Sequence, residues 1–160
     1  MLEDLDVPFF KVASMDIVNP NLLRHIARKH RPMVISTGMA TMAEIEQAVE
    51  TVRAEGNEQI ILLHCISIYP PDHEMIHLRN MAMLQQAFDV PVGFSDHSLG
   101  TSIPLAAVAL GACVIEKHFT LDKDMPGWDH AISADPEEMR VIVKEGRNIF
   151  TALGSTMRTV

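Results

Sequence analysis

Two histidines follow neighbouring apolar segments of the sequence at matching positions. His97 comes seven residues after Val90, where one apolar run begins, and His118 comes six residues after Ala112, where the next run begins. Two neutral imidazoles leave the remaining positions of a divalent cation open to water and substrate oxygens. If both runs are parallel strands, the two rings meet at one edge of the sheet, and we predict that they hold one metal ion. For either histidine alone, a hydrogen-bonded loop residue is the alternative.

Small polar side chains and one ammonium follow the apolar runs as well. Lys11 and Ser14 end the first run, Ser36 ends the second, and Ser67 and Ser95 end the third and fourth. Hydroxyls and an ammonium bind a phosphate or carboxylate through charge-assisted hydrogen bonds. Turn chemistry is the alternative for the serines, because serine favours loops. A lysine at a buried strand end is harder to explain in that way.

A long polar segment, residues 122–130, follows the last apolar run and carries the only tryptophan, Trp128. Long loops beside the mouth of a barrel often bind substrate. We therefore suggest Asp129 as an acceptor for a sugar hydroxyl. A surface turn built on Pro126 and Gly127 would have the same composition.

The elements that position these groups follow a repeating rhythm. Five apolar runs predict strands, and their continuous apolar character is typical of strands buried on both faces of a parallel sheet: 8–13, 32–36, 59–67, 90–94 and 112–118. Amphipathic segments between and after them predict helices: 21–29, 42–55, 78–88, 102–110 and 136–153. Thr41 with Glu44 forms a capping-box pattern, and Asp135 before Pro136 offers an N-cap and a first-turn proline.

The rhythm predicts an α/β fold, a partial (β/α)8 TIM barrel of about five units. Strand starts recur roughly every 22 to 31 residues, which suits β/α units joined by crossovers. A doubly wound sheet is the alternative, but no glycine-rich nucleotide loop is present, and polar residues follow every strand. A full barrel has eight units, so we expect residues 1–160 to be one domain, the C-terminal portion of a barrel with strands 4 to 8. Unpaired strand edges near Phe10 and Val114 would then favour association.

Composition excludes several classes of protein. The chain has 160 residues, 48% of them hydrophobic, and a net charge of −8 without a basic cluster, which argues against nucleic-acid binding. Cys65 and Cys113 lie inside apolar runs and are interpreted as two buried thiols in a reducing compartment. Neither a secretion signal nor a membrane-spanning stretch is recognisable. We therefore expect a cytoplasmic protein.

The strand ends, read in order, resemble the sialic acid synthase family, which comprises N-acetylneuraminate synthase and its legionaminate, pseudaminate and spore-coat polysaccharide relatives. The resemblance covers nearly the whole chain, and its order and spacing make it far more specific than any single motif. The matching stretches are 10–16, 35–39, 63–70, 93–97, 115–120 and 126–130.

The resemblance implies a reaction that joins carbon 3 of phosphoenolpyruvate to the aldehyde of an open-chain N-acylmannosamine-type sugar, with release of phosphate by C–O cleavage. It implies a Mn²⁺-like ion, with Mg²⁺ or Co²⁺ as alternatives, on His97 and His118. The phosphoenolpyruvate contacts would be Lys11, Ser14, Ser36, Ser67 and Ser95. The sugar-side positions would be Asp16, Tyr69 and Asp129, with Asp16 joining the two histidines as a catalytic group.

The resemblance also implies a homodimer, and it places upstream barrel units and a C-terminal antifreeze-like domain outside this chain, which alone should be inactive. Asp16 and Ser67 stand where some members have Glu and Asn. Two alternatives stay open: a synthase for a different nonulosonic acid, legionaminic or pseudaminic, and a non-catalytic barrel remnant that acts as an assembly module.

Overall fold

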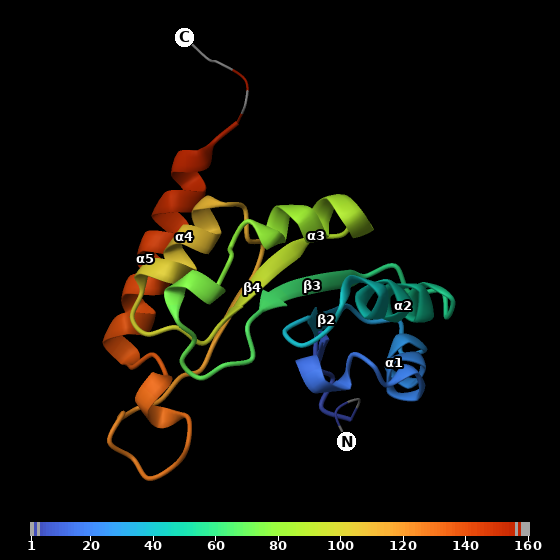
Figure 1. Cartoon of the computed structure of the whole chain (residues 1–160), viewed down its shortest axis with the longest axis horizontal. Helices are drawn as coiled ribbons and strands as arrows, with labels where there is room; N and C mark the ends of the chain where they lie inside the picture. Colours follow the sequence, from blue (N-terminus) through green and yellow to red (C-terminus); the bar gives the residue numbers. More distant parts are fainter. Residues whose placement is uncertain (1, 3, 156, 158–160) are drawn as a thin grey trace.

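The computed structural model describes residues 2, 4–155 and 157. Its strands alternate with helices along the chain (Figure 1). The strands are β1 (Phe10–Val12), β2 (Met33–Ser36), β3 (Ile60–Cys65), β4 (Val92–Asp96) and β5 (Ile115–Lys117). The α-helices are α1 (Pro20–Ala27), α2 (Met42–Arg53), α3 (Asn80–Phe88), α4 (Ser102–Ala109) and α5 (Pro136–Leu153), and the 3-10 turns are η1 (Ser14–Asp16), η2 (His73–Met75) and η3 (His130–Ile132). Every predicted strand and helix is present. Four strands are shorter than predicted, and β4 is shifted by two residues.

The strands form one parallel sheet in the order β1-β2-β3-β4-β5. A doubly wound sheet would reverse its strand order at some point, so the barrel-type prediction is confirmed. The sheet is strongly curved. In a flat sheet, β1 and β5 would lie about 19 Å apart, four steps of about 4.8 Å. Lys11 Nζ on β1 instead lies 3.5 Å from Glu116 Oε1 on β5. The two edge strands therefore face each other across the concave side of a half-barrel.

Side chains alternate between the two faces of this sheet. Val92 and Phe94 point into the apolar layer beneath the helices and are almost completely buried. The residues between and after them, Gly93 and Ser95, face the concave side. A Cβ on Gly93 would lie 2.5 Å from the Val114 carbonyl oxygen. Glycine is required there because β4 and β5 approach each other so closely.

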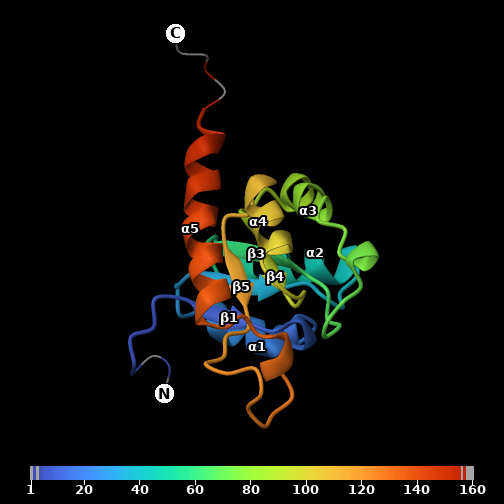
Figure 2. The same ribbon diagram turned by 90° about the vertical axis from the view of Figure 1, so that its left-hand side faces the viewer.

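Helix caps occur where the sequence predicts them. The Thr41 hydroxyl accepts a hydrogen bond from Glu44 N, and Asp135 accepts from two backbone N–H groups at the start of α5. Pro104 lies in the first turn of α4, where a proline is tolerated. α4 packs against α5, β4 and β5, and α5 runs along the side of the molecule (Figure 2).

One sequence interpretation is wrong. Cys65 is buried, but Cys113 is exposed. Cys113 lies just before β5, which pairs only with β4 in the described part of the chain, so no further strand covers it. Within the described residues, no helix has the length and apolar character needed to cross a membrane.

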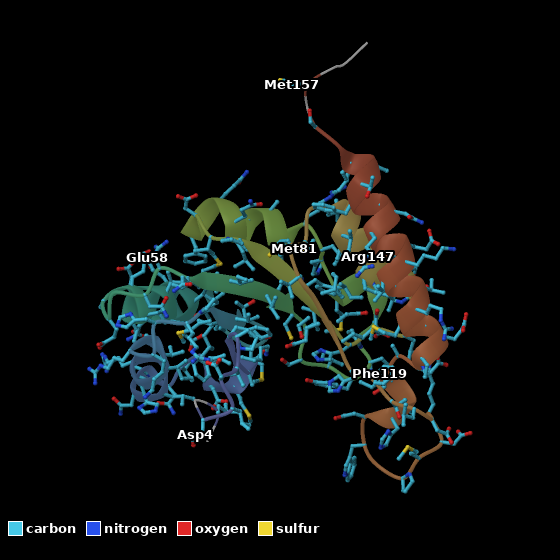
Figure 3. The ribbon with its side chains drawn as sticks, turned by 180° about the vertical axis from the view of Figure 1, so that it is seen from behind. Asp4, Glu58, Met81, Phe119, Arg147 and Met157 are labelled. Carbon is cyan, nitrogen blue, oxygen red and sulfur yellow. The ribbon has the colours of Figure 1, made fainter. Side chains whose placement is uncertain are left out.

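The segment between β5 and α5 projects away from the sheet (Figures 1 and 2). Phe119 lies at its start, and Arg147 lies further along the chain on α5 (Figure 3). Phe119 pairs with Ala134 in an isolated parallel bridge. The loop is therefore closed at its base, while Trp128 near its tip is 99% exposed.

Candidate active site

The carboxyl ends of the strands surround a cavity of about 490 Å³. In a barrel architecture this end of the strands is the one that carries chemistry. Eight of the ten predicted site residues line the cavity: Lys11, Ser14, Ser36, Ser67, Tyr69, Ser95, His97 and His118. The curvature of the sheet thus brings together groups that are separated by up to 107 positions in the sequence.

The two predicted metal ligands lie side by side. The ring centroids of His97 and His118 are 5.3 Å apart. Two imidazoles bound to one ion at about 2.1 Å, at angles near 90 to 110°, have centroids about 5 Å apart. His97 Nδ1 lies 2.9 Å from the Ile66 carbonyl oxygen, which leaves Nε2 available. The donor chemistry and the ring separation therefore fit one divalent cation.

The second histidine is oriented differently. His118 Nδ1 lies 3.9 Å from Asp129 Oδ2, and the carbonyl of His118 accepts a hydrogen bond from Ala134 N at 2.8 Å. At this distance the two groups are not hydrogen-bonded; the carboxylate lies beside the ring, as carboxylates do at many metal-binding histidines. No cluster of three or more His, Cys, Asp or Glu side chains suited to a metal is found in residues 2, 4–155 and 157. Within the described residues, His97 and His118 are the pair whose placement fits the predicted metal site.

Charge in the cavity changes the environment of its titratable groups. Burial lowers the pKa of His97, but contacts with the Cys65 thiol and the Ile66 carbonyl outweigh burial and raise that pKa overall. A metal ion must displace the imidazole proton, so metal binding at His97 would release it. Tyr69 packs its ring on His97 with centroids 4.1 Å apart. Burial raises the pKa of Tyr69, and nearby acidic groups raise it further, which keeps its hydroxyl protonated.

A carboxylate that the sequence did not predict as a site residue, that of Glu116, also lines the cavity. Ser95 Oγ donates a hydrogen bond to Glu116 Oε1 at 2.7 Å, and the Lys11 ammonium lies 3.5 Å from the same oxygen. Glu116 thus holds two groups that were predicted to bind an anion. The alternation of side chains along a strand could have revealed it, because Glu116 precedes His118 by two residues and shares its face.

Serine hydroxyls line the part of the cavity at the ends of β1, β2 and β3. Ser14 Oγ accepts a hydrogen bond from Gly38 N at 3.0 Å. Ser36 Oγ is buried and has no hydrogen-bond partner among the described residues, which is unusual for a buried polar group and fits its predicted role as an anion contact. Cys65 lies within 4.0 Å of both Ser14 and Ser67. Cys65 was predicted only as a buried thiol, yet it also lines the cavity.

Two predicted residues lie outside the cavity lining. Asp16 is half-buried at the end of η1, and it is not among the residues that line the cavity. Asp129, whose side chain is 55% exposed, lies outside the cavity lining and approaches His118. The position of Asp129 depends on the long loop, whose course no local sequence pattern predicts.

The chain is similar to known proteins over nearly its whole length. The model of the NeuB family matches residues 1–158. An N,N'-diacetyllegionaminic acid synthase of Legionella pneumophila is 46% identical over 158 residues, which cover 96% of this chain and 44% of that protein. The human N-acetylneuraminate-9-phosphate synthase is 44% identical over 155 residues, 96% of this chain and 43% of that protein. The chain therefore spans about half the length of the curated relatives that it matches.

A solved structure agrees in fold. The crystal structure of an N-acetylneuraminic acid (sialic acid) synthetase from Leptospira borgpetersenii in complex with citrate superposes with a TM-score of 0.94 at 39% identity. The match covers 99% of this chain and 55% of that one. The five-stranded half-barrel is therefore an arrangement that also occurs within a longer chain.

Proposed function

Because the chain belongs to the NeuB family, we propose that it carries the phosphoenolpyruvate and metal side of a synthase active site. The reaction condenses phosphoenolpyruvate with an N-acylated amino sugar of the N-acylmannosamine type to give a sialic acid-like nonulosonic acid and phosphate. The observation that carries the proposal is the convergence of an ammonium, a nest of hydroxyls and two adjacent imidazoles on one cavity.

The anionic groups of phosphoenolpyruvate bind to the ammonium and hydroxyl walls. Lys11 supplies the positive charge, and the hydroxyls of Ser14, Ser36 and Ser95 supply hydrogen bonds. The unpaired Ser36 hydroxyl gains a partner when the anion is bound. Glu116 holds Lys11 and Ser95 in place before substrate arrives. Ser67, beside Cys65, completes this wall.

The acceptor sugar lies on the imidazole side. His97 and His118 would hold a divalent cation, Mn²⁺ in this proposal with Mg²⁺ or Co²⁺ as substitutes, which when bound polarises the sugar aldehyde. Tyr69 donates and Asp129 accepts hydrogen bonds to the sugar hydroxyls. For Asp16, a catalytic role is supported by the family resemblance alone, because its side chain lies outside the cavity lining. Carbon 3 of phosphoenolpyruvate bonds to the aldehyde carbon, a water oxygen adds at carbon 2, and phosphate leaves with the bridging oxygen.

The acceptor is defined only as an N-acylated amino sugar, because the relatives are named for different products. We also propose that the protein works as a homodimer in the cytoplasm. In the described chain β1 and β5 each pair on one side only, so an unpaired edge on each is available to a partner. Five strands wall only part of the cavity. We therefore expect this chain to bind phosphoenolpyruvate and metal without turnover.

Calorimetric titration of the purified chain tests the proposal. Phosphoenolpyruvate should bind more tightly in the presence of Mn²⁺ than in its absence, and Lys11→Met should weaken this binding. Lys144→Met, on the exposed side of α5, removes the same charge far from the cavity and should bind as the unaltered chain does. Absence of any phosphoenolpyruvate binding, or equal weakening by both variants, would refute the proposal.

A further inference from the structure

A buried ion pair lies beside the two histidines at the ends of β4 and β5, and both of its residues also border the cavity. Lys117 Nζ lies 2.7 Å from Asp96 Oδ2, and the two side chains are 2% and 0% exposed. Asp96 immediately precedes His97, and Lys117 immediately precedes His118. The two residues are also paired in register across β4 and β5. The ion pair therefore joins the two strands one residue before each proposed metal ligand.

A third residue closes the arrangement into a ring of hydrogen bonds. Asp96 Oδ1 accepts from the backbone N–H of Ser98 at 2.9 Å and from its hydroxyl at 2.7 Å. The Lys117 ammonium donates to the Ser98 carbonyl at 2.6 Å. His97 is thus flanked by two residues that are both bound to Lys117, the residue before His118. The backbone on either side of His97 cannot shift relative to β5 without breaking these bonds.

We propose that the Asp96–Lys117 ion pair, together with Ser98, is a positioning device that sets the separation of the two imidazoles so that they can share one cation. This inference rests on the metal role in the proposed function. It concerns residues that do not themselves bind the ion, and it gives them a function beyond stabilising the fold.

The two histidines depend on this device to different degrees. His97 has its own support, because Nδ1 contacts the Ile66 carbonyl and the ring packs on Tyr69. The ring of His118 makes a longer approach, 3.9 Å, to Asp129. Its position therefore follows from its backbone. His118 directly follows β5, a strand of three residues that pairs only with β4 in the described chain, and its carbonyl also accepts a hydrogen bond from Ala134 N.

Stability alone does not account for a buried ion pair at this position. Removing two charges from water is costly, and replacing such a pair with apolar side chains of similar size is often neutral or stabilising. An apolar pair has no polar groups. It would not connect the strand ends through directed bonds, and that directed connection is what the spacing of the imidazoles requires.

Variants of the pair separate positioning from stability. The singles Asp96→Asn and Lys117→Met each leave a polar group unpaired and should lower the melting temperature. The double variant removes both charges and should recover stability, but its Mn²⁺ affinity should stay about 10- to 100-fold below that of the unaltered chain, the usual range for loss of an outer support. Val52→Ala, on the buried side of α2, serves as the control that lowers stability without altering β4 or β5.

Two readouts are measured on all variants: Mn²⁺ affinity by titration, and the imidazole ¹³Cε1–¹H resonances of His97 and His118 in the metal-free protein by NMR. We expect the double variant to lose affinity and to shift the His118 resonance, whereas Val52→Ala changes neither. Unaltered affinity and unaltered resonances in the double variant, or an equal loss in Val52→Ala, would overturn the inference. If the unaltered chain binds no Mn²⁺, the metal role fails, and the metal-free resonances still decide the positioning role.

Discussion

Gly38 gives the sharpest test of the anion pocket, because its missing side chain is what leaves room for the hydroxyls. A Cβ at Gly38 would lie 2.4 Å from Ser67 Oγ and 2.9 Å from Ser14 Oγ. Ordinary contact begins near 3.4 Å, so in Gly38→Ala the Ser67 hydroxyl must move by about 1 Å. Both hydroxyls are the ends of short side chains that can rotate. The collision is therefore relieved by turning away the groups that we propose as phosphoenolpyruvate ligands.

The expected effects on stability and on phosphoenolpyruvate affinity both follow from this movement of the hydroxyls. Overpacking a well-packed site costs about 1 to 3 kcal/mol, and we expect the lower end for folding stability because the hydroxyls can turn. A hydrogen bond to a charged group contributes about 1.5 to 3 kcal/mol. Loss of one such bond to phosphoenolpyruvate weakens binding about 10- to 100-fold, since about 1.4 kcal/mol corresponds to a factor of ten. Gly38→Ala should therefore affect binding more than stability.

The assay compares Gly38→Ala with Gly146→Ala. Around Gly146, in α5, a Cβ would meet its nearest neighbours at 3.9 Å. That alanine should fit, raise stability by about 0.5 to 1 kcal/mol through better helix propensity, and leave binding unchanged. Calorimetry gives the affinity, and urea unfolding gives the stability. A folded Gly38→Ala variant with unaltered affinity would show that these hydroxyls do not bind phosphoenolpyruvate.

Three further predictions concern metal, pH and a helix cap. His118→Ala should weaken Mn²⁺ binding by more than about 100-fold, because loss of even an outer support costs about 10- to 100-fold. The control His25→Ala, on the exposed side of α1, should leave Mn²⁺ binding unchanged. Titration with Mn²⁺ measures both affinities. Burial lowers the pKa of His64 below 6.5, so the unfolded chain binds more protons there. Stability should therefore fall as pH drops from about 6.5 through the lowered pKa, and His64→Gln should flatten that part of a pH series of urea unfolding curves; an unchanged slope would contradict the assignment. Asp135→Ala removes the acceptor for two backbone N–H groups of α5 and should cost about 1 kcal/mol, which urea unfolding would reveal, and a loss below about 0.3 kcal/mol would contradict the role of the cap.

The sequence predicted the number, type and order of elements because each depends on local chemistry. Continuous apolar runs identified the strands, and Thr41 and Asp135 identified two helix starts correctly. Strand ends were less accurate, because their limits depend on pairing with neighbours. β5 shows this most clearly: it keeps three of the seven predicted residues, since only β4 pairs with it in the described chain.

The polar lining of the cavity was also predictable, because the carboxyl ends of parallel strands share one edge. Glu116 and Cys65 were missed as site residues for a different reason. Each acts through what lies across the cavity or beside it, such as Lys11 opposite Glu116. Those distances depend on the curvature of the sheet, which no local pattern contains.

Because side chains alternate along each strand, positions that stabilise the core alternate with positions that line the cavity. On β4, Val92 and Phe94 turn toward the helices, whereas Ser95 turns toward the cavity. Laboratory evolution of new acceptor preferences can therefore diversify every second position at the strand ends and leave the intervening residues unaltered. A library built in this way should yield many more folded clones than one that varies consecutive positions. Side chains on one side of each strand line the cavity, whereas those on the other side pack in the core and stabilise the fold.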